Sequence, residues 1–364
     1  MPAPTEQALL DALKGVVDPN TGRDFVSTKQ LKNLRVDGGD VAFDVELGYP
    51  ARSQIAGLRR ALIAAAREVP GVANVSANLT VKITAHAVQR GVQLLPKVKN
   101  VVAVASGKGG VGKSTTAVNL ALALAAEGAS VGILDADIYG PSQPMMMGIA
   151  GRPESIDGQT MEPLENHGVQ VMSIGFLVDA DNPMIWRGPM ATQALEQLLR
   201  QTNWRELDYL IVDMPPGTGD IQLTLSQRVP LTGAVIVTTP QDIALLDARK
   251  GLKMFEKVGV PILGIVENMA VYCCPNCGHV EHIFGAEGGK KMAAEYGVDY
   301  LGALPLNLSI REQADSGRPT VVSEPDGEIA GIYKTVARQV AVKVALKAKD
   351  FSAKFPTITV SKST

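Results

Sequence analysis

Long apolar runs are absent from this 364-residue sequence. No uninterrupted stretch approaches the roughly 18 apolar residues that a membrane-spanning helix needs, which argues against a transmembrane segment. The first residues, MPAPTEQALLDALK, carry Glu6 and Asp11 and have no basic start before an apolar run. They predict an amphipathic helix and not a signal or transit peptide.

Cysteine is also scarce. The chain has three cysteines, Cys273, Cys274 and Cys277, all within five residues of one another. A disulfide framework needs cysteines spread along the chain, so this spacing excludes one. We therefore expect a cytoplasmic protein with a single place for thiol chemistry.

Neither positive nor negative charge is in large excess. Lys and Arg total 35 and Asp and Glu total 37, so the net charge gives no general case for nucleic-acid binding. Hydrophobic residues make up 46% and charged residues 20%, which is typical of a folded soluble chain. The length suggests about two domains.

The first part of the chain, residues 1–88, predicts a small α+β domain. An apolar stripe fits one helix, and a helical stretch rich in Ala, Leu and Arg runs from about Ser53 to Glu68. Alternating apolar residues predict strands, the first of them after the hairpin signal Asp37-Gly38-Gly39-Asp40. The stripe is Leu9, Leu10, Leu13, Val16 and Val17, and the alternating residues are Val41, Phe43, Val45 and Leu47, then Leu79, Val81 and Ile83.

Residues 89–97 look like a linker, residues 98–349 form the second predicted domain, and residues 350–364 are a C-terminal tail. In the second domain, near-continuous apolar strands alternate with helical patterns, which predicts an α/β fold with a mainly parallel sheet flanked by helices. The expected strands are Val101–Ala105, Val131–Leu134, Val169–Ile174, Tyr209–Val212, Ala234–Thr238, Ile262–Val266 and Tyr300–Ala303. The expected helices are Lys113–Ala126, Ala191–Gln201, Ile243–Val258, Gly288–Tyr296 and Glu328–Ala348.

A phosphate loop is the strongest motif. Gly107-Lys108-Gly109-Gly110-Val111-Gly112-Lys113-Ser114 follows a predicted strand and opens a predicted helix. Its glycines let successive N–H groups point at phosphate oxygens, and the start of the helix adds its positive dipole end. Lys113 supplies a cation for the β- and γ-phosphates and the Ser114 hydroxyl is placed for Mg²⁺. Lys108 is not required by an ordinary phosphate loop and, alone, is as consistent with a solvated surface lysine.

Carboxylates end two of the predicted strands. Asp135 and Asp137 follow one strand and Asp213 follows another, at the edge where α/β sheets bind ligands. An acidic residue at the end of a buried strand is the usual Mg²⁺ partner of a phosphate loop. Such carboxylates can also merely cap helices.

The segment Cys274-Pro275-Asn276-Cys277-Gly278 places two thiols for one metal centre, but soft-metal sites usually have four ligands. His279 and His282 could complete a zinc site in one chain. The pair could instead be a redox couple or a structural turn. Alternatively, two chains each give two cysteines to one four-thiolate site on a two-fold axis. Cys273 is a possible extra ligand, and geometry alone does not separate zinc from an iron–sulfur cluster.

Several motifs together resemble a known family. The loop GKGGVGKS resembles the deviant Walker A motif of the MinD/ParA ATPases. The wider set of motifs is LDADIYGPS (134–142), WRGPM (186–190), DMPPGTGD (213–220), VENM (266–269), CPNCG (274–278), IFG (283–285) and LPLNLSIREQADSGRP (304–319). Together these motifs resemble the Mrp/ApbC family of iron–sulfur cluster carriers, and residues 1–88 resemble a small iron–sulfur assembly-factor module.

The resemblance implies an ATPase that binds ATP and Mg²⁺ and shares a [4Fe–4S] cluster between two subunits through Cys274 and Cys277. Lys108 would reach the phosphates of the partner subunit, Lys113 would contact those of its own, and Asp137 would lie near the attacking water. Asp213 and Ser114 would hold Mg²⁺, and Asn268 would contact the base. The nucleotide-binding residues are then Gly107, Lys108, Gly109, Gly110, Val111, Gly112, Lys113, Ser114, Thr115, Asp213 and Asn268.

The function that we expect is transfer of the cluster from donor proteins to apo iron–sulfur proteins by a homodimer, without nucleic acid or stable membrane association. One alternative is a spatial-organising ATPase that binds membrane or DNA through the basic face of residues 328–349. Another is a scaffold with structural zinc. Residues 1–88 contain no cysteine, so we expect them to dock or regulate and not to ligate the cluster.

Overall fold

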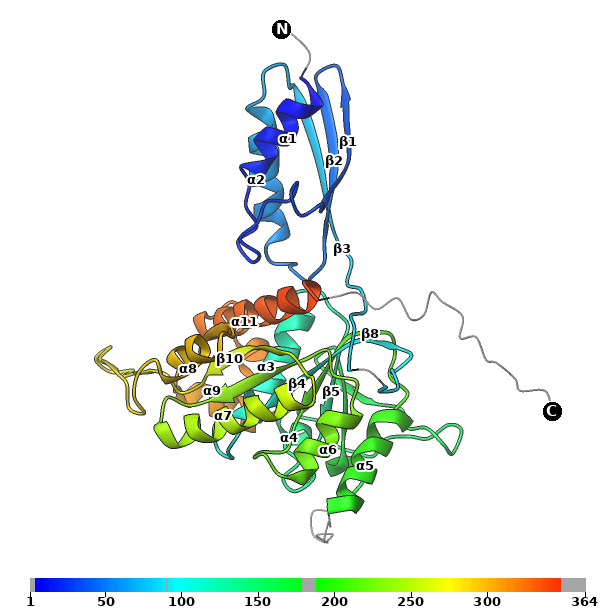
Figure 1. The fold of residues 1–364 in the computed structure, drawn as a ribbon, viewed down its shortest axis with the longest axis vertical. Coiled ribbons are helices and arrows are strands. Elements are labelled where there is room, and N and C mark those ends of the chain that lie inside the picture. The colour runs from blue at the N-terminus through cyan, green and yellow to red at the C-terminus, as the bar shows by residue number, and fades with distance from the viewer. Residues whose placement is uncertain (1–3, 90, 179–187, 348–364) are drawn as a thin grey trace, which may run out of the picture.

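The computed structural model describes residues 4–89, 91–178 and 188–347. Trp186, Arg187 and the expected tail at 350–364 lie outside these residues, as does the expected end of the last helix at Ala348. The described residues form a small N-terminal unit and a larger α/β unit (Figure 1). None of the helices described has a stretch long and apolar enough to cross a membrane.

The small unit is a three-stranded sheet with two helices. Strands β1 (Leu31–Asp37) and β2 (Asp40–Leu47) are antiparallel, and β2 pairs in parallel with β3 (Asn74–Val81). Helices α1 (Glu6–Lys14) and α2 (Ile55–Arg67) cover one face of this sheet (Figure 1). Alternation along β2 turns Val41, Phe43, Val45 and Leu47 towards the helices and leaves the other face of the sheet exposed.

Three residues depart from the predicted elements of the small unit. Val16 and Val17 were expected on the first helix, but α1 ends at Lys14 because the Gly15 backbone N–H caps it. Val17 is therefore half exposed outside the helix. Ile83 lies beyond the end of β3, although its side chain is buried.

The large unit contains an eight-stranded sheet in the order β13-β10-β9-β4-β8-β5-β7-β6. All neighbouring strands are parallel except β6 and β7, which confirms the predicted mainly parallel sheet. The strands are β4 (Val98–Ala105), β5 (Val131–Asp135), β6 (Leu164–Asn166), β7 (Val169–Ser173), β8 (Leu207–Asp213), β9 (Gly233–Thr238), β10 (Ile262–Glu267) and β13 (Tyr300–Ala303).

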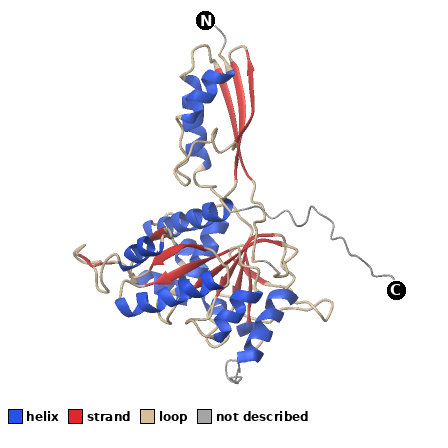
Figure 2. Ribbon diagram, in the orientation of Figure 1, coloured by secondary structure: helices blue, strands red, loops and turns tan. Residues whose placement is uncertain are grey.

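Helices cover both faces of this sheet (Figure 2). The predicted helices appear as α3 (Lys113–Ala126), α5 (Gly188–Gln201), α7 (Asp242–Lys257), α8 (Gly288–Tyr296) and α11 (Glu328–Ala345). The chain also forms α4 (Gln143–Met146), a 3₁₀ turn at Ile174–Phe176, α6 (Asp220–Arg228), α9 (Leu308–Asp315) and α10 (Thr320–Ser323), which we did not predict. A two-stranded hairpin, β11 (Tyr272–Cys273) and β12 (Val280–Glu281), lies outside the large sheet.

The last helix, α11, packs on α3 and on the sheet. Its residues Val336, Ala337, Val340 and Val344 are buried. The apolar face of the helix is therefore packed inside the protein.

A buried charge cluster fastens the small unit to the large one. Glu127, at the C-terminal end of α3, accepts hydrogen bonds from the Ser53 N–H (2.9 Å) and the Ser53 hydroxyl (2.6 Å). The Arg338 guanidinium of α11 donates to the same carboxylate at 2.6 Å. Because Glu127 is almost fully buried, these partners compensate the cost of removing its charge from water. The small unit is thus held on the helix that begins at the phosphate loop.

Candidate functional site

The phosphate loop joins β4 to α3, and its backbone needs glycine at two kinds of position. Gly110 and Gly112 both have φ of 80°, a left-handed conformation that other residues rarely adopt. At Gly107 a side chain has no room, because a Cβ atom would lie 2.1 Å from the Asp247 backbone of α7. The loop is therefore shaped by backbone geometry and by close packing against α7.

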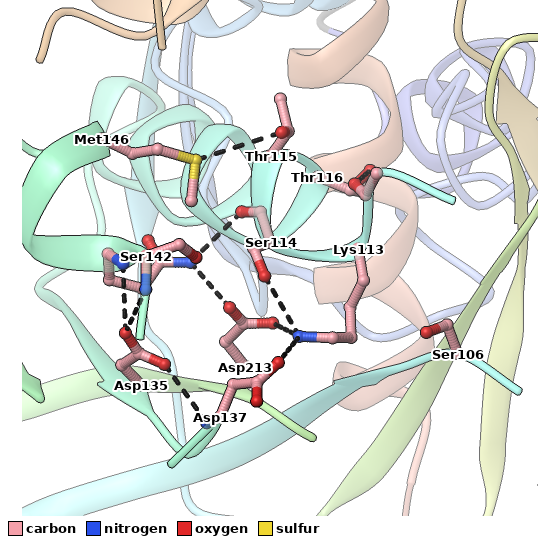
Figure 3. A network of polar contacts seen from close by, with 12 residues as sticks. Ser106, Lys113, Ser114, Thr115, Thr116, Asp135, Asp137, Ser142, Met146 and Asp213 are labelled. Carbon is pink, nitrogen blue, oxygen red and sulfur yellow. Dashed lines mark hydrogen bonds and ion pairs between the residues drawn. The ribbon is translucent and has the colours of Figure 1, made fainter. Parts of the chain in front are cut away.

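Lys113 lies at the centre of a buried polar network (Figure 3). Its ammonium nitrogen is 2.5 Å from Asp213 Oδ1, 3.1 Å from Ser114 Oγ and 3.8 Å from Asp137 Oδ2. Burial raises the pKa of the Asp137 carboxyl, an effect that the nearby Lys113 charge opposes. The sequence-predicted Lys113, Ser114, Asp137 and Asp213 therefore converge on one point.

The same network has the chemistry of a magnesium site. The Ser114 hydroxyl and the Asp213 carboxylate already point at one cation, the Lys113 ammonium. Hard oxygen donors of this kind suit Mg²⁺. Beside them, Gln143 Oε1 and Ser142 Oγ are buried without a hydrogen-bond partner among the described residues. The donor set therefore fits a hydrated divalent cation that binds with nucleotide.

Asp135 serves the loop that follows β5. Its carboxylate accepts hydrogen bonds from the N–H groups of Ser142 and Gln143, both at 3.0 Å, and from the Ser173 hydroxyl at 3.1 Å. Burial, reinforced by the neighbouring Asp213, raises the pKa of Asp135 to about 7. Asp135 thus caps the short helix α4, which is the capping role that strand-end carboxylates can also have.

Three further predicted residues lie on or next to the phosphate loop. Lys108 is exposed, and its carbonyl accepts a hydrogen bond from the Ser106 hydroxyl at 2.9 Å. Asn268 is buried and its side-chain amide donates to the Val111 carbonyl at 2.9 Å. Asn268 therefore supports the phosphate loop from the end of β10. Thr115, on the first turn of α3, donates from its hydroxyl to the Met146 sulfur at 3.9 Å.

The cysteines lie on the hairpin of β11 and β12, which projects beyond α8 as the gold loop at the left of Figure 1. The turn is closed by the Gly278 N–H, which donates to the Cys274 carbonyl at 2.9 Å, and by the Cys274 N–H, which donates to the His279 carbonyl at 2.9 Å. Cys273 and Cys277 are exposed and Cys274 is half-buried. The tip of the hairpin therefore presents its thiols to the surroundings.

Backbone groups stabilise the thiolate form of Cys274. The N–H groups of Cys277 and Asn276 donate towards its sulfur and lower the pKa of the Cys274 thiol. His282 is held elsewhere, because its Nδ1 atom pairs with the Ala270 carbonyl at 2.8 Å. Among the described residues no group of three or more His, Cys, Asp and Glu side chains is arranged to hold a metal ion.

One residue connects the hairpin to the nucleotide pocket. Asn268, whose amide binds the phosphate loop, precedes Tyr272, the first residue of β11, by four positions. The intervening backbone is anchored, since the Ala270 N–H donates to Leu304 and the Leu306 N–H donates to Val271. A short, hydrogen-bonded stretch of backbone therefore connects the phosphate loop to the cysteine hairpin.

Comparison with known proteins assigns the large unit. Residues 97–341 match the family model described as NUBPL iron-transfer P-loop NTPase, and residues 6–77 match that of an iron–sulfur cluster assembly protein. The chain belongs to the NUBPL iron-transfer P-loop NTPase family. This confirms the resemblance and the fold class that the sequence predicted.

Relatives of this P-loop NTPase carry consistent names. The iron-sulfur cluster carrier protein of Pseudomonas fragi is 61% identical over 73% of this chain and 94% of its own. That of Synechocystis is 46% identical over 94% of this chain and 99% of its own. Among solved structures, a nucleotide-binding protein from Archaeoglobus fulgidus in complex with ADP has 38% identity and a TM-score of 0.56, over 64% of this chain and 90% of that one.

The structure of the P-loop NTPase also adds a residue to the site that we had not singled out. The Gln143 amide nitrogen donates to Asp213 Oδ2 at 2.9 Å and to the Ser114 carbonyl at 3.2 Å. Gln143 therefore fixes the two residues predicted to hold Mg²⁺. Its only sequence signal is its place directly after the LDADIYGPS segment, since α4 is too short to show a helical period.

Proposed function

We propose that this P-loop NTPase is an iron–sulfur cluster carrier in which two copies hold one [4Fe–4S] cluster and deliver it to apo-proteins. The observation that carries the proposal is the pair of an exposed Cys277 and a half-buried Cys274 at the tip of a hairpin that Asn268 connects to the phosphate loop. The names of the relatives support it, because both are iron-sulfur cluster carrier proteins.

Two thiols per chain make half of a four-thiolate site. A second copy related by a two-fold axis would present the same two thiols and complete it. In the described residues no third ligand joins Cys274 and Cys277, which supports the two-chain site over a zinc site closed by His279 and His282. Ligation at an exposed interface suits a cargo that has to leave.

ATP hydrolysis in this proposal depends on charge and position. Lys113 neutralises charge on the transferred phosphoryl group, and Lys108 of each chain reaches the nucleotide of the other chain. Asp137 orients the attacking water. Ser114 and Asp213 would hold Mg²⁺, which would supply the remaining positive charge. Gln143 holds Asp213 and Ser114 in position relative to each other through its two hydrogen bonds.

Transfer is coupled to nucleotide through Asn268. Nucleotide on the phosphate loop changes the position of Val111, and Asn268 passes that change to the hairpin. The partners are cluster donors and apo iron–sulfur proteins, without nucleic acid or stable membrane contact. We place the protein in the cytoplasm, where thiols stay reduced.

A transfer assay tests the proposal. The protein is reconstituted anaerobically with iron and sulfide, and activation of an apo iron–sulfur enzyme is followed. We expect Cys277→Ala to bind no stable cluster and to activate none of the acceptor, because only one thiol per chain remains in the C-x-x-C turn.

Cys273→Ala is the matched control. It removes an exposed thiol one residue from Cys274 but leaves the C-x-x-C pair intact. We expect it to load and transfer like the wild type. Equal cluster loading in Cys277→Ala and wild type would refute the carrier proposal.

A further inference from the structure

A cavity of about 830 Å³ lies where the small unit meets the large one. Its walls come from the loop after α1, from the ends of β1, β2 and β3, from β4 and from the last turn of α11. The predicted active site does not include any of these segments. The lining of the cavity includes Gly48 and Tyr49, which follow β2.

Basic residues outnumber acidic ones in the lining of this cavity. Among the described residues, one acidic side chain, Glu46, lines it, whereas five Lys and Arg side chains do: Arg23, Lys29, Lys32, Lys82 and Lys99.

Part of this charge is already compensated. Lys32 lies 2.7 Å and Lys82 3.8 Å from the Glu46 carboxylate, and Lys99 lies 2.7 Å from Asp208. The ion pairs of the described residues include none to Arg23 or Lys29. The last turn of α11 adds the partial negative charge of a helix C-terminus, which is about half a charge. A clear positive excess remains, and it is centred on Arg23 and Lys29.

The arrangement of these cations indicates the kind of ligand. All five are exposed, and they come from four separate segments around the mouth of the cavity. A small free ion is usually held by a few buried, convergent donors. Exposed charges spread over a wide rim instead favour a ligand with several negative charges along its length, which they steer and orient.

The sheet of the small unit supplies a platform beside this rim. Glu46 alternates with the buried Val45 and Leu47, so it lies on the sheet face opposite α1 and α2. Figure 1 shows helices on only one side of β1, β2 and β3. The cavity therefore borders an open surface along which an extended chain can lie.

We propose that this cavity, which we call the basic cleft, binds an acidic peptide segment of a partner protein. The site is separate from the thiols and from the nucleotide pocket, so the proposal does not rest on cluster transfer. The chain's own last residues, 348–364, are a poor ligand, because they carry Lys349, Lys354 and Lys362 against a single acid, Asp350. The basic cleft would give the small unit the docking role that its lack of cysteine suggested.

Fluorescence anisotropy of a labelled decaglutamate peptide with the full-length protein tests this. We expect saturable binding at about 0.1 M salt, where exposed charges further apart than roughly 10 Å are screened. The double variant Arg23→Glu/Lys29→Glu should weaken that binding by about tenfold or more, because it reverses the two cations of the basic cleft that form no ion pair among the described residues.

The matched control is Arg59→Glu/Arg60→Glu. These residues are also exposed on the small unit, but they lie on α2, which covers the other face of the sheet. The control makes the same change in net charge and should weaken binding by less than about threefold. Both double variants should keep the wild-type rate of ATP hydrolysis and the wild-type thermal unfolding midpoint. If charge reversal prevents folding, Arg23→Gln/Lys29→Gln is used instead. It too should weaken decaglutamate binding more than the control variant does.

Several results would overturn the proposal. They are absence of decaglutamate binding, an equal loss in the two double variants, and displacement of the peptide by micromolar citrate or phosphate, which would indicate a site for free anions. Tighter binding of a single-stranded oligonucleotide than of decaglutamate, with the same sensitivity to Arg23→Glu/Lys29→Glu, would indicate a nucleic-acid site instead.

Discussion

The nucleotide pocket and the cysteine hairpin are joined through Asn268, but they differ in how much of each lies inside the protein. In the pocket, Lys113 and Asp213 are buried and contact each other directly. On the hairpin, Cys277 is exposed, and the contacts that shape the turn come from the backbone. In the proposed carrier, one chain thus builds most of the nucleotide site but only half of the cluster site, and a second copy supplies the other half.

Removal of the central cation is expected to have the largest effect. Lys113→Ala should lower ATP hydrolysis by roughly a hundredfold or more, because no other buried cation among the described residues faces Asp213. Phosphate release at saturating ATP measures this. Lys250→Ala, which removes an exposed lysine paired with Asp247, is the control and should stay near the wild-type rate. Similar rates in Lys113→Ala and wild type would show that the pocket is not the hydrolytic site.

Lys108→Ala extends the comparison of buried and exposed parts to the phosphate loop itself, because Lys108 is exposed whereas Lys113 is buried. If Lys108 acts on the nucleotide of the partner chain, the variant should bind ADP almost as the wild type does but hydrolyse ATP at least about tenfold more slowly. Calorimetry with ADP and phosphate release separate the two steps. A parallel loss of ADP affinity would place Lys108 in its own chain's pocket.

Asn268→Ala tests the link between the two regions. Loss of the bond to the Val111 carbonyl should lower the free energy of unfolding by about 1 kcal/mol. It should also abolish the change that ATP causes in amide hydrogen exchange over residues 272–281. Asn307→Ala removes the cap of α9 at a similar cost of about 1 kcal/mol and should preserve that change. An intact response in Asn268→Ala would mean that the coupling takes another route.

The smallest expected effect concerns the Cys274 thiol in metal-free protein. A lowered pKa increases the thiolate fraction at neutral pH, so alkylation should reach its half-maximal rate below the ordinary thiol value of 9.0. The rate is measured on Cys273→Ala/Cys277→Ala, which removes the contact of the Cys277 thiol but keeps the backbone N–H groups of Cys277 and Asn276, the larger causes of the lowered pKa. In urea the midpoint should return towards 9.0. The same pH midpoint of alkylation in folded and unfolded chains would contradict the claim that the folded turn lowers the pKa of the Cys274 thiol.

The sequence predicts the parts of the site that are set by local chain order. The bounds of α3 follow from Gly112 and from the Ala- and Leu-rich run after it, and the strand-end position of Asp213 follows from an apolar run. Gln143 could not be found in this way, because its contact with Asp213 depends on how the loop after β5 folds over β8. The apolar stripe wrongly extended the first helix to Val16 and Val17, because hydrophobic periodicity carries no information about the cap at Gly15.

The contact between the two units was also beyond sequence reasoning. Ser53, Glu127 and Arg338 come from three distant segments, and each alone is typical of an exposed polar residue. Periodicity identifies the apolar face of a helix but not the partner of a charge at its end. For the same reason the cations of the basic cleft appear unrelated in the sequence.

The central claim is that two chains together complete the centre of which each holds half. Anaerobic reconstitution followed by native mass spectrometry, with iron and sulfide counted, tests it most directly. The account predicts one four-iron, four-sulfide cluster for every two 38.4 kDa chains, and its loss with Cys277→Ala. A complete cluster or a zinc ion held by a single chain would contradict it.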